Sequence, residues 1–177
     1  VGAGGIGSPV VWLLAKLGVR RIRVYDDDTV QQHNLPTTMF SPRDLGKLKV
    51  DALRRLVAPF GCEVVAVPHR FTEKTRLPRT DILVSAVDGG KGPRPSMAAR
   101  RLLFRVAKRE KIPLFIDGRI GGENLRVYSI RPNKKEDRAL YQKTLVPDSR
   151  VAPLPCNAQQ VCDVGGMTAS LMVRAVR

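Results

Sequence analysis

Three glycines at the start of the sequence are spaced as in a phosphate-binding turn. Gly2, Gly4 and Gly7 match the pattern G-x-G-x-x-G, and Ser8 begins the apolar run that follows. Glycine adopts positive φ and lets the backbone approach phosphates, which then lie at the N-terminus of the next helix. Asp26, 19 residues beyond Gly7, could accept a hydrogen bond from a ribose hydroxyl. The motif predicts a nucleotide site but does not choose between a dinucleotide and ATP.

A second group of charged residues favours ATP with magnesium. Asp26 and Asp28 come just after a predicted strand. Lys49 lies in the sequence GKLK, and Asp88 follows the buried apolar run 81–87. A lysine balances triphosphate charge, and a carboxylate oxygen binds a hard cation such as Mg²⁺. A hydride-transfer site needs neither group. An NAD-binding Rossmann oxidoreductase is kept as the alternative from another enzyme class.

Strands and helices alternate along the chain, and this order predicts the layers that position the charged residues. Alternation after a glycine turn predicts an α/β fold: a doubly wound, Rossmann-like, mostly parallel sheet with helices on both faces. The short connection 119–124 predicts an antiparallel edge at the C-terminal end, and the polar stretch 131–155 predicts a long connection. We expect strands at 21–25, 63–67, 81–87, 113–117 and 125–130, and helices at 8–17, 44–57, 96–111 and from about 164 onward.

Length and composition bound the class of protein. A chain of 177 residues suits one domain, 1–177, and its first and last residues predict truncation at both ends. No apolar run is long enough to cross a bilayer. The three cysteines (Cys62, Cys156 and Cys162) contain no CxxC pair, which predicts reduced thiols, a cytoplasmic protein and no zinc site.

The motifs taken together resemble the ubiquitin-activating-enzyme-like adenylating family of the ThiF/MoeB type, with HesA-like members. This family includes adenylyltransferases that charge the small sulfur-carrier proteins of thiamine and molybdopterin synthesis. The resemblance covers essentially the whole chain. The family pattern GxGGxGS, D-x-D-x-V, N-L-x-R-Q, G-x-x-K and D-N corresponds here to GAGGIGS (2–8), DDDTV (26–30), NLPTT (34–38), GKLK (46–49) and AVDGG (86–90).

The resemblance implies attack by a C-terminal glycine carboxylate on the α-phosphate of ATP, with release of pyrophosphate. The protein then contributes positioning and charge neutralisation. It also implies a small ubiquitin-like or sulfur-carrier protein as partner and a homodimer as the working assembly. In this scheme Gly4, Gly5 and Gly7 approach the phosphates, Asp28 binds the ribose with Asp26 beside it, Asn34 and Lys49 face the phosphates, and Asp88 binds Mg²⁺.

Two departures from the family pattern bear on activity. Thr37 stands where the family has arginine, with Thr38 in place of glutamine, and Gly89 stands where an asparagine follows the magnesium ligand. A guanidinium binds two phosphate oxygens at once, whereas a hydroxyl cannot. Arg43 is a candidate substitute. The departures leave a third hypothesis open, namely a binding protein of the same fold without catalysis.

Cys156 is the candidate thiol. Family members that pass the activated carboxyl group to a thiol carry a cysteine in the loop before the last helix, and Cys156 in PLPCNAQQV lies in that region. A nearby helix N-terminus would lower its pKa. The alternative is an ordinary semi-buried thiol. Cys162 and Cys62 are weaker candidates.

The chain is strongly basic, with 31 Lys and Arg against 16 Asp and Glu and a net charge of +15. Such a balance fits an acidic protein, nucleic acid or a membrane surface as partner. Aromatic residues are only 5% and none lies within the basic run, so nucleic-acid binding is secondary and no membrane partner is expected. The predicted docking surface for an acidic partner is the outward face of helix 97–111, formed by Arg100, Arg101, Arg105, Lys108 and Arg109.

Overall fold

The computed structural model describes residues 1–87, 96–121, 124–150 and 162–176. Its strands form two hydrogen-bonded sheets. In the first, β1 (Arg21–Tyr25) pairs in parallel with β2 (Glu63–Val67). In the second, β3 (Ile82–Ser85) is parallel to β4 (Leu114–Gly121), which pairs antiparallel with the edge strand β5 (Asn124–Ile130). The helices are α1 (Gly7–Lys16), α2 (Lys49–Val57), α3 (Ala98–Arg109), α4 (Lys135–Thr144) and α5 (Cys162–Arg174), with 3₁₀ turns η1 (Gln32–Thr37), η2 (Pro42–Asp44), η3 (Ala58–Phe60) and η4 (Asp148–Arg150).

Val1 and Gly2 join the two sheets. The Val1 nitrogen donates a hydrogen bond to the Val84 carbonyl at 2.7 Å, and the Ala86 amide donates to the Val1 carbonyl at 2.9 Å. On the other side, the Gly2 amide donates to the Tyr25 carbonyl at 3.0 Å. The spatial order is therefore β2, β1, residues 1–2, β3, β4 and β5, which is the strand order of a doubly wound fold. The predicted strand directions and antiparallel edge are confirmed, although two small sheets replace the single sheet that we expected.

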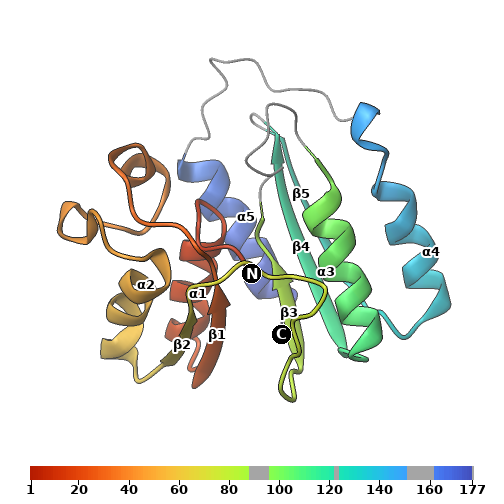
Figure 1. Cartoon of the computed structure of the whole chain (residues 1–177), viewed down its shortest axis with the longest axis horizontal. Helices are drawn as coiled ribbons and strands as arrows, with labels where there is room; N and C mark the ends of the chain where they lie inside the picture. Colours follow the sequence, from red (N-terminus) through yellow and green to blue (C-terminus); the bar gives the residue numbers. More distant parts are fainter. Residues whose placement is uncertain (88–95, 122–123, 151–161, 177) are drawn as a thin grey trace.

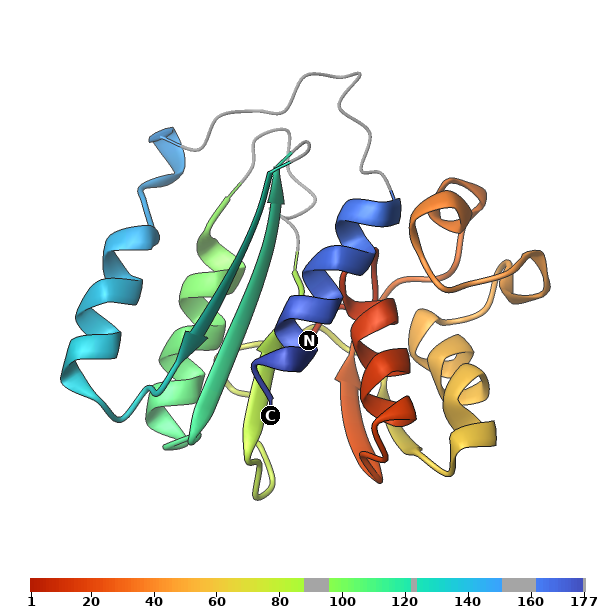
Figure 2. The same cartoon turned by 180° about the vertical axis from the view of Figure 1, so that it is seen from behind.

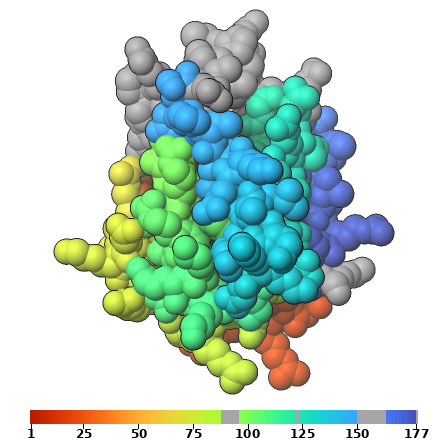
Figure 3. Space-filling view, turned by 90° about the vertical axis from the view of Figure 1, so that its right-hand side faces the viewer, coloured from red at the N-terminus to blue at the C-terminus, as the bar shows by residue number. Residues whose placement is uncertain are grey.

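Helices cover both faces of the sheets, as the sequence predicts. Figures 1 and 2 show α1, α2 and α5 on one face and α3 and α4 on the other. On the first face α5 packs against α1, β4 and β5, while α2 packs against β2. Seen from the side, α3 and α4 lie next to each other over the second face (Figure 3). None of the helices within the described residues is long and apolar enough to cross a membrane.

Two predictions about the elements are wrong. The helix expected at 44–57 begins only at Lys49, because Gly46 has a φ of +78° and Leu48 forms an isolated bridge with Thr29. The backbone from Asp44 to Leu48 is therefore a turn, and it pairs with Thr29 and Val30 shortly after β1.

The second error lies in 131–155, where we expected a connection without regular structure. Its first part contains α4, whose Tyr141 is fully buried. The Tyr141 ring packs on Phe104 and Phe115, with centroid distances of 4.6 and 5.5 Å. Charge also supports this helix, since Glu136 and Asp137 lie in its first turn and a lysine in its last. The polar stretch is thus a helix that packs on the core through Tyr141.

The basic face of α3 differs from the prediction at one position. Arg100 is only 6% exposed and points inward, whereas the sequence places it on the outer surface. Arg105 pairs with Glu73 at 3.1 Å, and Arg109 pairs with Glu110 at 2.8 Å. Much of the predicted docking surface is therefore neutralised within the chain.

Candidate nucleotide site

The glycine loop, residues 2–7, packs tightly against neighbouring backbone at two of its glycines and has open space beside a third. Gly2 has a φ of +90°, and a Cβ atom there would lie 2.4 Å from the Ala86 carbonyl oxygen. A Cβ atom on Gly7 would lie 1.9 Å from the Gly2 carbonyl oxygen. At Gly4, by contrast, no atom of the described residues, apart from Gly4 and its chain neighbours, lies within 4 Å of the Cβ position. The loop can thus form only with glycine at 2 and 7, and it leaves room for a ligand at Gly4.

The loop leads directly into the N-terminus of α1. The Ser8 amide donates to the Gly4 carbonyl at 2.9 Å, and the buried Ser8 hydroxyl accepts a hydrogen bond from the Met39 amide at 3.1 Å. The first amides of an α-helix have no acceptor within the helix and carry partial positive charge, so they attract anions. This arrangement fits a phosphate group.

Asp26 fastens the loop to the end of β1. Its Oδ2 accepts the Ala3 amide hydrogen at 2.8 Å, and its Oδ1 accepts the Asp28 amide hydrogen at 2.9 Å. Hydrogen bonds from backbone amides to a carboxylate are among the stronger ones in proteins. Asp26 therefore braces the loop. Contact between Asp26 and a ribose stays a prediction.

Asp28 and Lys49, predicted to belong to one site, lie side by side. The Lys49 ammonium is 3.1 Å from the Asp28 Oδ2, and the Lys49 amide donates to the Asp28 carbonyl at 2.9 Å. The Lys49 side chain is 10% exposed and that of Asp28 is 33% exposed. Lys49 opens α2 and Asp28 follows β1, so the Lys49 ammonium group lies close to the end of this strand.

Asn34 lies in η1, where its groups stabilise the turn. Its Oδ1 accepts the Gln31 amide hydrogen at 3.0 Å. Its carbonyl oxygen accepts hydrogen bonds from the hydroxyls of Thr38 at 2.7 Å and Thr37 at 3.4 Å. The Thr37 hydroxyl, at the position of the family arginine, thus serves the local turn. The exposed Arg43 lies in η2.

Asp88 and Cys156, two of the predicted site residues, lie outside the described residues. Within the described part of the chain, one set of acids has oxygens close enough for a shared cation: Asp26, Asp27 and Asp28, within 4.8 Å of one another. Each already has a partner, since Asp26 accepts two amides, Asp27 pairs with Arg70 at 3.2 Å and Asp28 pairs with Lys49. The assignment of magnesium to Asp88 stays a prediction.

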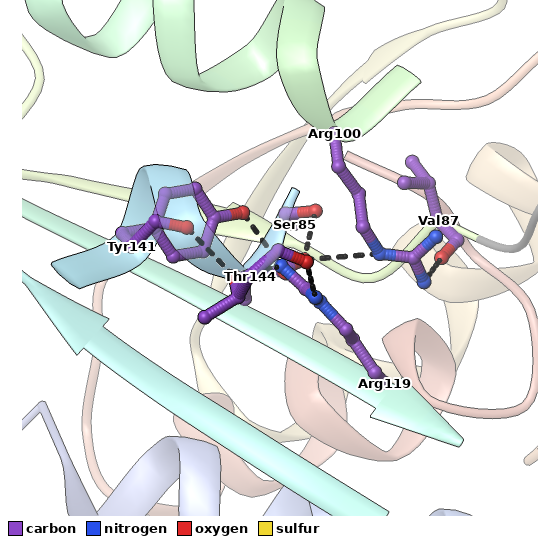
Figure 4. A network of polar contacts seen from close by, with 7 residues as sticks. Ser85, Val87, Arg100, Arg119, Tyr141 and Thr144 are labelled. Atoms are coloured by element: carbon purple, nitrogen blue, oxygen red, sulfur yellow. Dashed lines mark hydrogen bonds and ion pairs between the residues drawn. The ribbon is translucent and has the colours of Figure 1, made fainter. Parts of the chain in front are cut away.

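A buried polar network in the other half of the molecule was missed by the sequence analysis (Figure 4). Its centre is Asp117 on β4, which is 0% exposed. Asp117 accepts hydrogen bonds from Ser85 Oγ at 2.7 Å, Arg119 Nε at 2.7 Å and Tyr141 Oη at 3.0 Å, and its Oδ1 lies 3.5 Å from Arg100 Nε. An acid and an arginine inside the apolar run PLFIDGRI were the available signal.

The two arginines connect Asp117 to more distant backbone. Arg119 donates to the carbonyl and hydroxyl oxygens of Thr144, each at 3.0 Å, and its guanidinium lies 4.5 Å from the centre of the Tyr128 ring. Arg100 Nη2 donates to the Val87 carbonyl at 2.5 Å. The network therefore runs from the end of α4 to the end of β3.

Burial and charge shift the titration of two groups in this network. Burial raises the pKa of the Tyr141 phenol, and the neighbouring Asp117 carboxylate raises it further. Burial alone would lower the pKa of Arg119, but the Asp117 carboxylate outweighs it, so the pKa of the guanidinium is raised. Tyr141 therefore stays neutral and donates a hydrogen bond to Asp117.

Solved structures share this fold. A crystal structure of E. coli MccB with AMPCPP and MccA matches 99% of this chain and 53% of its own, with a TM-score of 0.75 and 21% identity. MccB with ATP matches the same shares with a TM-score of 0.72, and a structure of PaaA matches with a TM-score of 0.71 at 16% identity. At such identities the likeness establishes the fold.

Curated relatives match shorter stretches. The SAMP-activating enzyme E1 of Haloferax volcanii is 31% identical over 120 residues, which are 64% of this chain and 42% of the relative. Ubiquitin-like modifier-activating enzyme 5 of Arabidopsis thaliana is 37% identical over 65 residues, 37% of this chain and 15% of the relative. The matches thus span less than half of these curated relatives. The model of the ThiF family matches residues 1–175, in agreement with the resemblance of the motifs, and the chain belongs to the ThiF family.

Proposed function

We propose that this chain is the ATP-binding core of an adenylyltransferase that activates the C-terminal glycine of a small ubiquitin-like or sulfur-carrier protein. The observation that carries the proposal is the glycine loop, open at Gly4 and braced by Asp26, with the Lys49–Asp28 pair at the end of the neighbouring strand. Two relatives are named as activating enzymes, and structures of the same fold contain ATP or AMPCPP. These likenesses support an ATP site at this loop.

The proposed reaction forms one bond and breaks another. A carboxylate oxygen of the carrier's C-terminal glycine attacks the α-phosphorus of ATP. The bond from this phosphorus to the bridging oxygen breaks, and pyrophosphate leaves with the electron pair. The α1 N-terminus and the Lys49 ammonium offset the negative charge on the phosphates, which is stabilisation by preorganised charge. Asp28 orients Lys49 and is the proposed partner of the ribose hydroxyls.

Asn34 and Asp88 complete the proposed site. Asn34 lies in η1 and is assigned to the phosphates. Asp88 is assigned to Mg²⁺, which when bound would neutralise phosphate charge. Cys156 is proposed to accept the activated acyl group. Thr37 lacks the forked donors of the family arginine, so we expect a slow reaction unless Arg43 or another chain supplies them.

An NAD-binding oxidoreductase is the second candidate, because the glycine spacing and the acid after β1 also occur in dinucleotide sites. One observation favours ATP. Lys49 places a cation beside Asp28, close to the end of β1, and hydride transfer has no use for a cation there.

ATP–pyrophosphate exchange with candidate carrier proteins that end in glycine tests the proposal. We expect carrier-dependent exchange that Asp88→Ala and Lys49→Ala strongly reduce, while Asp27→Ala, a change at an exposed neighbour, leaves it intact. Absence of exchange with every carrier would contradict adenylation. NADH binding without ATP binding would favour the oxidoreductase. Binding of a carrier without ATP, unchanged in Lys49→Ala, would favour a non-catalytic binding protein.

The proposed homodimer needs an exposed apolar surface, and we propose a groove among the described residues for this contact. A groove between α1 and α5 is lined by Leu13, Leu17, Leu171 and Val173, among others, and the side chains of Leu17 and Leu171 are exposed. Exposed apolar patches of this kind mark contact surfaces. Leu171→Glu is expected to shift a dimer to a monomer in analytical ultracentrifugation.

A further inference from the structure

We propose that Arg100 is a positioning residue for the glycine loop, and that the Asp117 network holds it in that role. The proposal rests on the proposed function only in taking the loop as the place where phosphate binds. It gives Arg100 a role other than the docking surface to which the sequence analysis assigned it.

The first step is the contact between Arg100 and the end of β3. Arg100 is 6% exposed, and its Nη2 donates to the Val87 carbonyl at 2.5 Å. Its Nε lies 3.5 Å from Asp117 Oδ1. The guanidinium thus connects the backbone that follows β3 with a carboxylate fixed on β4.

The second step is the contact between this backbone and the loop. A Cβ atom on Gly2 would lie 2.4 Å from the Ala86 carbonyl oxygen and 3.3 Å from the Val87 nitrogen. The Ala86 amide donates to the Val1 carbonyl at 2.9 Å. The backbone of residues 86–87 is therefore in contact with the start of the loop, and we expect a shift of this backbone to move the loop.

The third step is the rigidity of the anchor. Asp117 also accepts hydrogen bonds from Ser85, Arg119 and Tyr141, and Arg119 binds Thr144 at the end of α4. These donors come from β3, β4 and α4. A carboxylate held from three elements has little freedom, so it fixes Arg100. Figure 4 shows this chain of contacts from Thr144 to Val87.

A loop held in its binding conformation loses less entropy when the ligand binds. Arg100→Leu is therefore expected to weaken ATP binding about 10-fold in calorimetric titrations, because the loop is less preorganised. Adenosine, which has no phosphate, should bind within about twofold of the wild type. Arg100→Lys keeps the charge but cannot span Val87 and Asp117 together, so we expect an intermediate loss.

Arg105→Leu is the matched control, since Arg105 is on the same helix but exposed and paired with Glu73. We expect wild-type ATP affinity in this variant.

Hydrogen exchange measured without nucleotide supplies a second readout. In Arg100→Leu and Arg100→Lys, the amides of residues 2–7 and 86–87 should exchange about 10-fold faster or more, with α2 and β2 unchanged. Tyr141→Phe, which removes only a hydroxyl from the anchor, should change the same amides to a smaller extent. This variant keeps the test available if Arg100→Leu does not fold.

Two results would overturn the inference. One is ATP affinity within about twofold of the wild type in a folded Arg100 variant; the other is faster exchange spread evenly over the chain. If the wild type binds no ATP, the proposed function fails at that point. The exchange measurement then still decides whether Arg100 positions the loop.

Discussion

Asp26 and Asp117 are two carboxylates that belong to neighbouring parts of the fold, and their surroundings are opposite. Asp26 follows β1 and accepts two backbone amides at the edge of the glycine loop. Asp117 lies in β4, fully buried, and contacts four side chains, two of them arginines. The sequence predicts both acids at the end of a strand, where ligands bind in doubly wound folds, but β4 continues beyond Asp117 to Gly121.

The difference lies in what surrounds each acid. Around Asp26 the donors are backbone amides, Gly4 is open, and the adjoining Asp28–Lys49 pair is partly exposed. Around Asp117 every partner is a side chain, and no solvent reaches the carboxylate. The predicted position of an acid at a strand end therefore does not identify a binding site. The two acids differ in that the surroundings of Asp26 are partly exposed, whereas Asp117 is fully buried.

The largest expected effect is on stability, from Asp117→Asn. The change leaves two buried guanidiniums without their carboxylate, which typically costs about 3–5 kcal/mol. Urea unfolding should show this loss, whereas Asp27→Asn at an exposed pair should cost less than about 0.5 kcal/mol. Equal effects of the two substitutions would remove the distinction between the two regions.

The next effect is on catalysis, from Lys49→Ala. We expect carrier-dependent ATP–pyrophosphate exchange to fall about 100- to 1,000-fold, since a cation at the phosphates is lost. The unfolding free energy should change by less than about 1 kcal/mol, because Asp28 remains partly solvated. A destabilised Lys49→Ala variant that keeps the wild-type exchange rate per folded molecule would contradict this, because Lys49 would then have a structural role only.

A smaller effect is expected for Asp26→Ala. Loss of two hydrogen bonds from amides to a carboxylate should weaken ATP binding about 10-fold and destabilise the protein by about 1–3 kcal/mol. Asp26→Asn keeps one acceptor oxygen and should lie between. Titration calorimetry and urea unfolding measure both quantities. Wild-type ATP affinity in Asp26→Ala would show that the loop needs no brace.

The smallest effect concerns pH. The pKa of Tyr141 is raised by burial and by Asp117, so the unfolded phenol ionises first, near its ordinary value of 10. Its contribution to stability is present below pH 10 and is lost as pH rises above it, by up to about 1.4 kcal/mol per pH unit. Tyr141→Phe should show a shallower loss of unfolding free energy between about pH 10 and 11. Tyr25, whose pKa is also raised, supplies a loss common to both proteins.

The sequence predicted those parts of the fold that local pattern determines. β1 and β2 have the predicted bounds because both are short runs rich in β-branched residues. α4 was missed because its one buried residue, Tyr141, packs on aromatic partners that come from α3, β4 and β5. A local pattern does not reveal such tertiary contacts.

The candidate site also contains features that the sequence predicted and features that it did not. The proximity of Asp28 and Lys49 followed from their motifs and is confirmed at 3.1 Å. The brace formed by Asp26 was not predictable, because it depends on where the Ala3 amide points. The inward course of Arg100 was missed because helical spacing alone places it on a basic face, while its buried partner is 17 residues away on β4.

Calorimetric titration of ATP, adenosine and NADH into the wild type and Lys49→Ala tests the central claim most directly. The claim is that the glycine loop and Lys49 form a triphosphate site. We expect the wild type to bind ATP and not NADH, and Lys49→Ala to weaken ATP binding at least about 10-fold while adenosine binds unchanged. Binding of NADH without ATP, or an ATP affinity that Lys49→Ala does not alter, would contradict it.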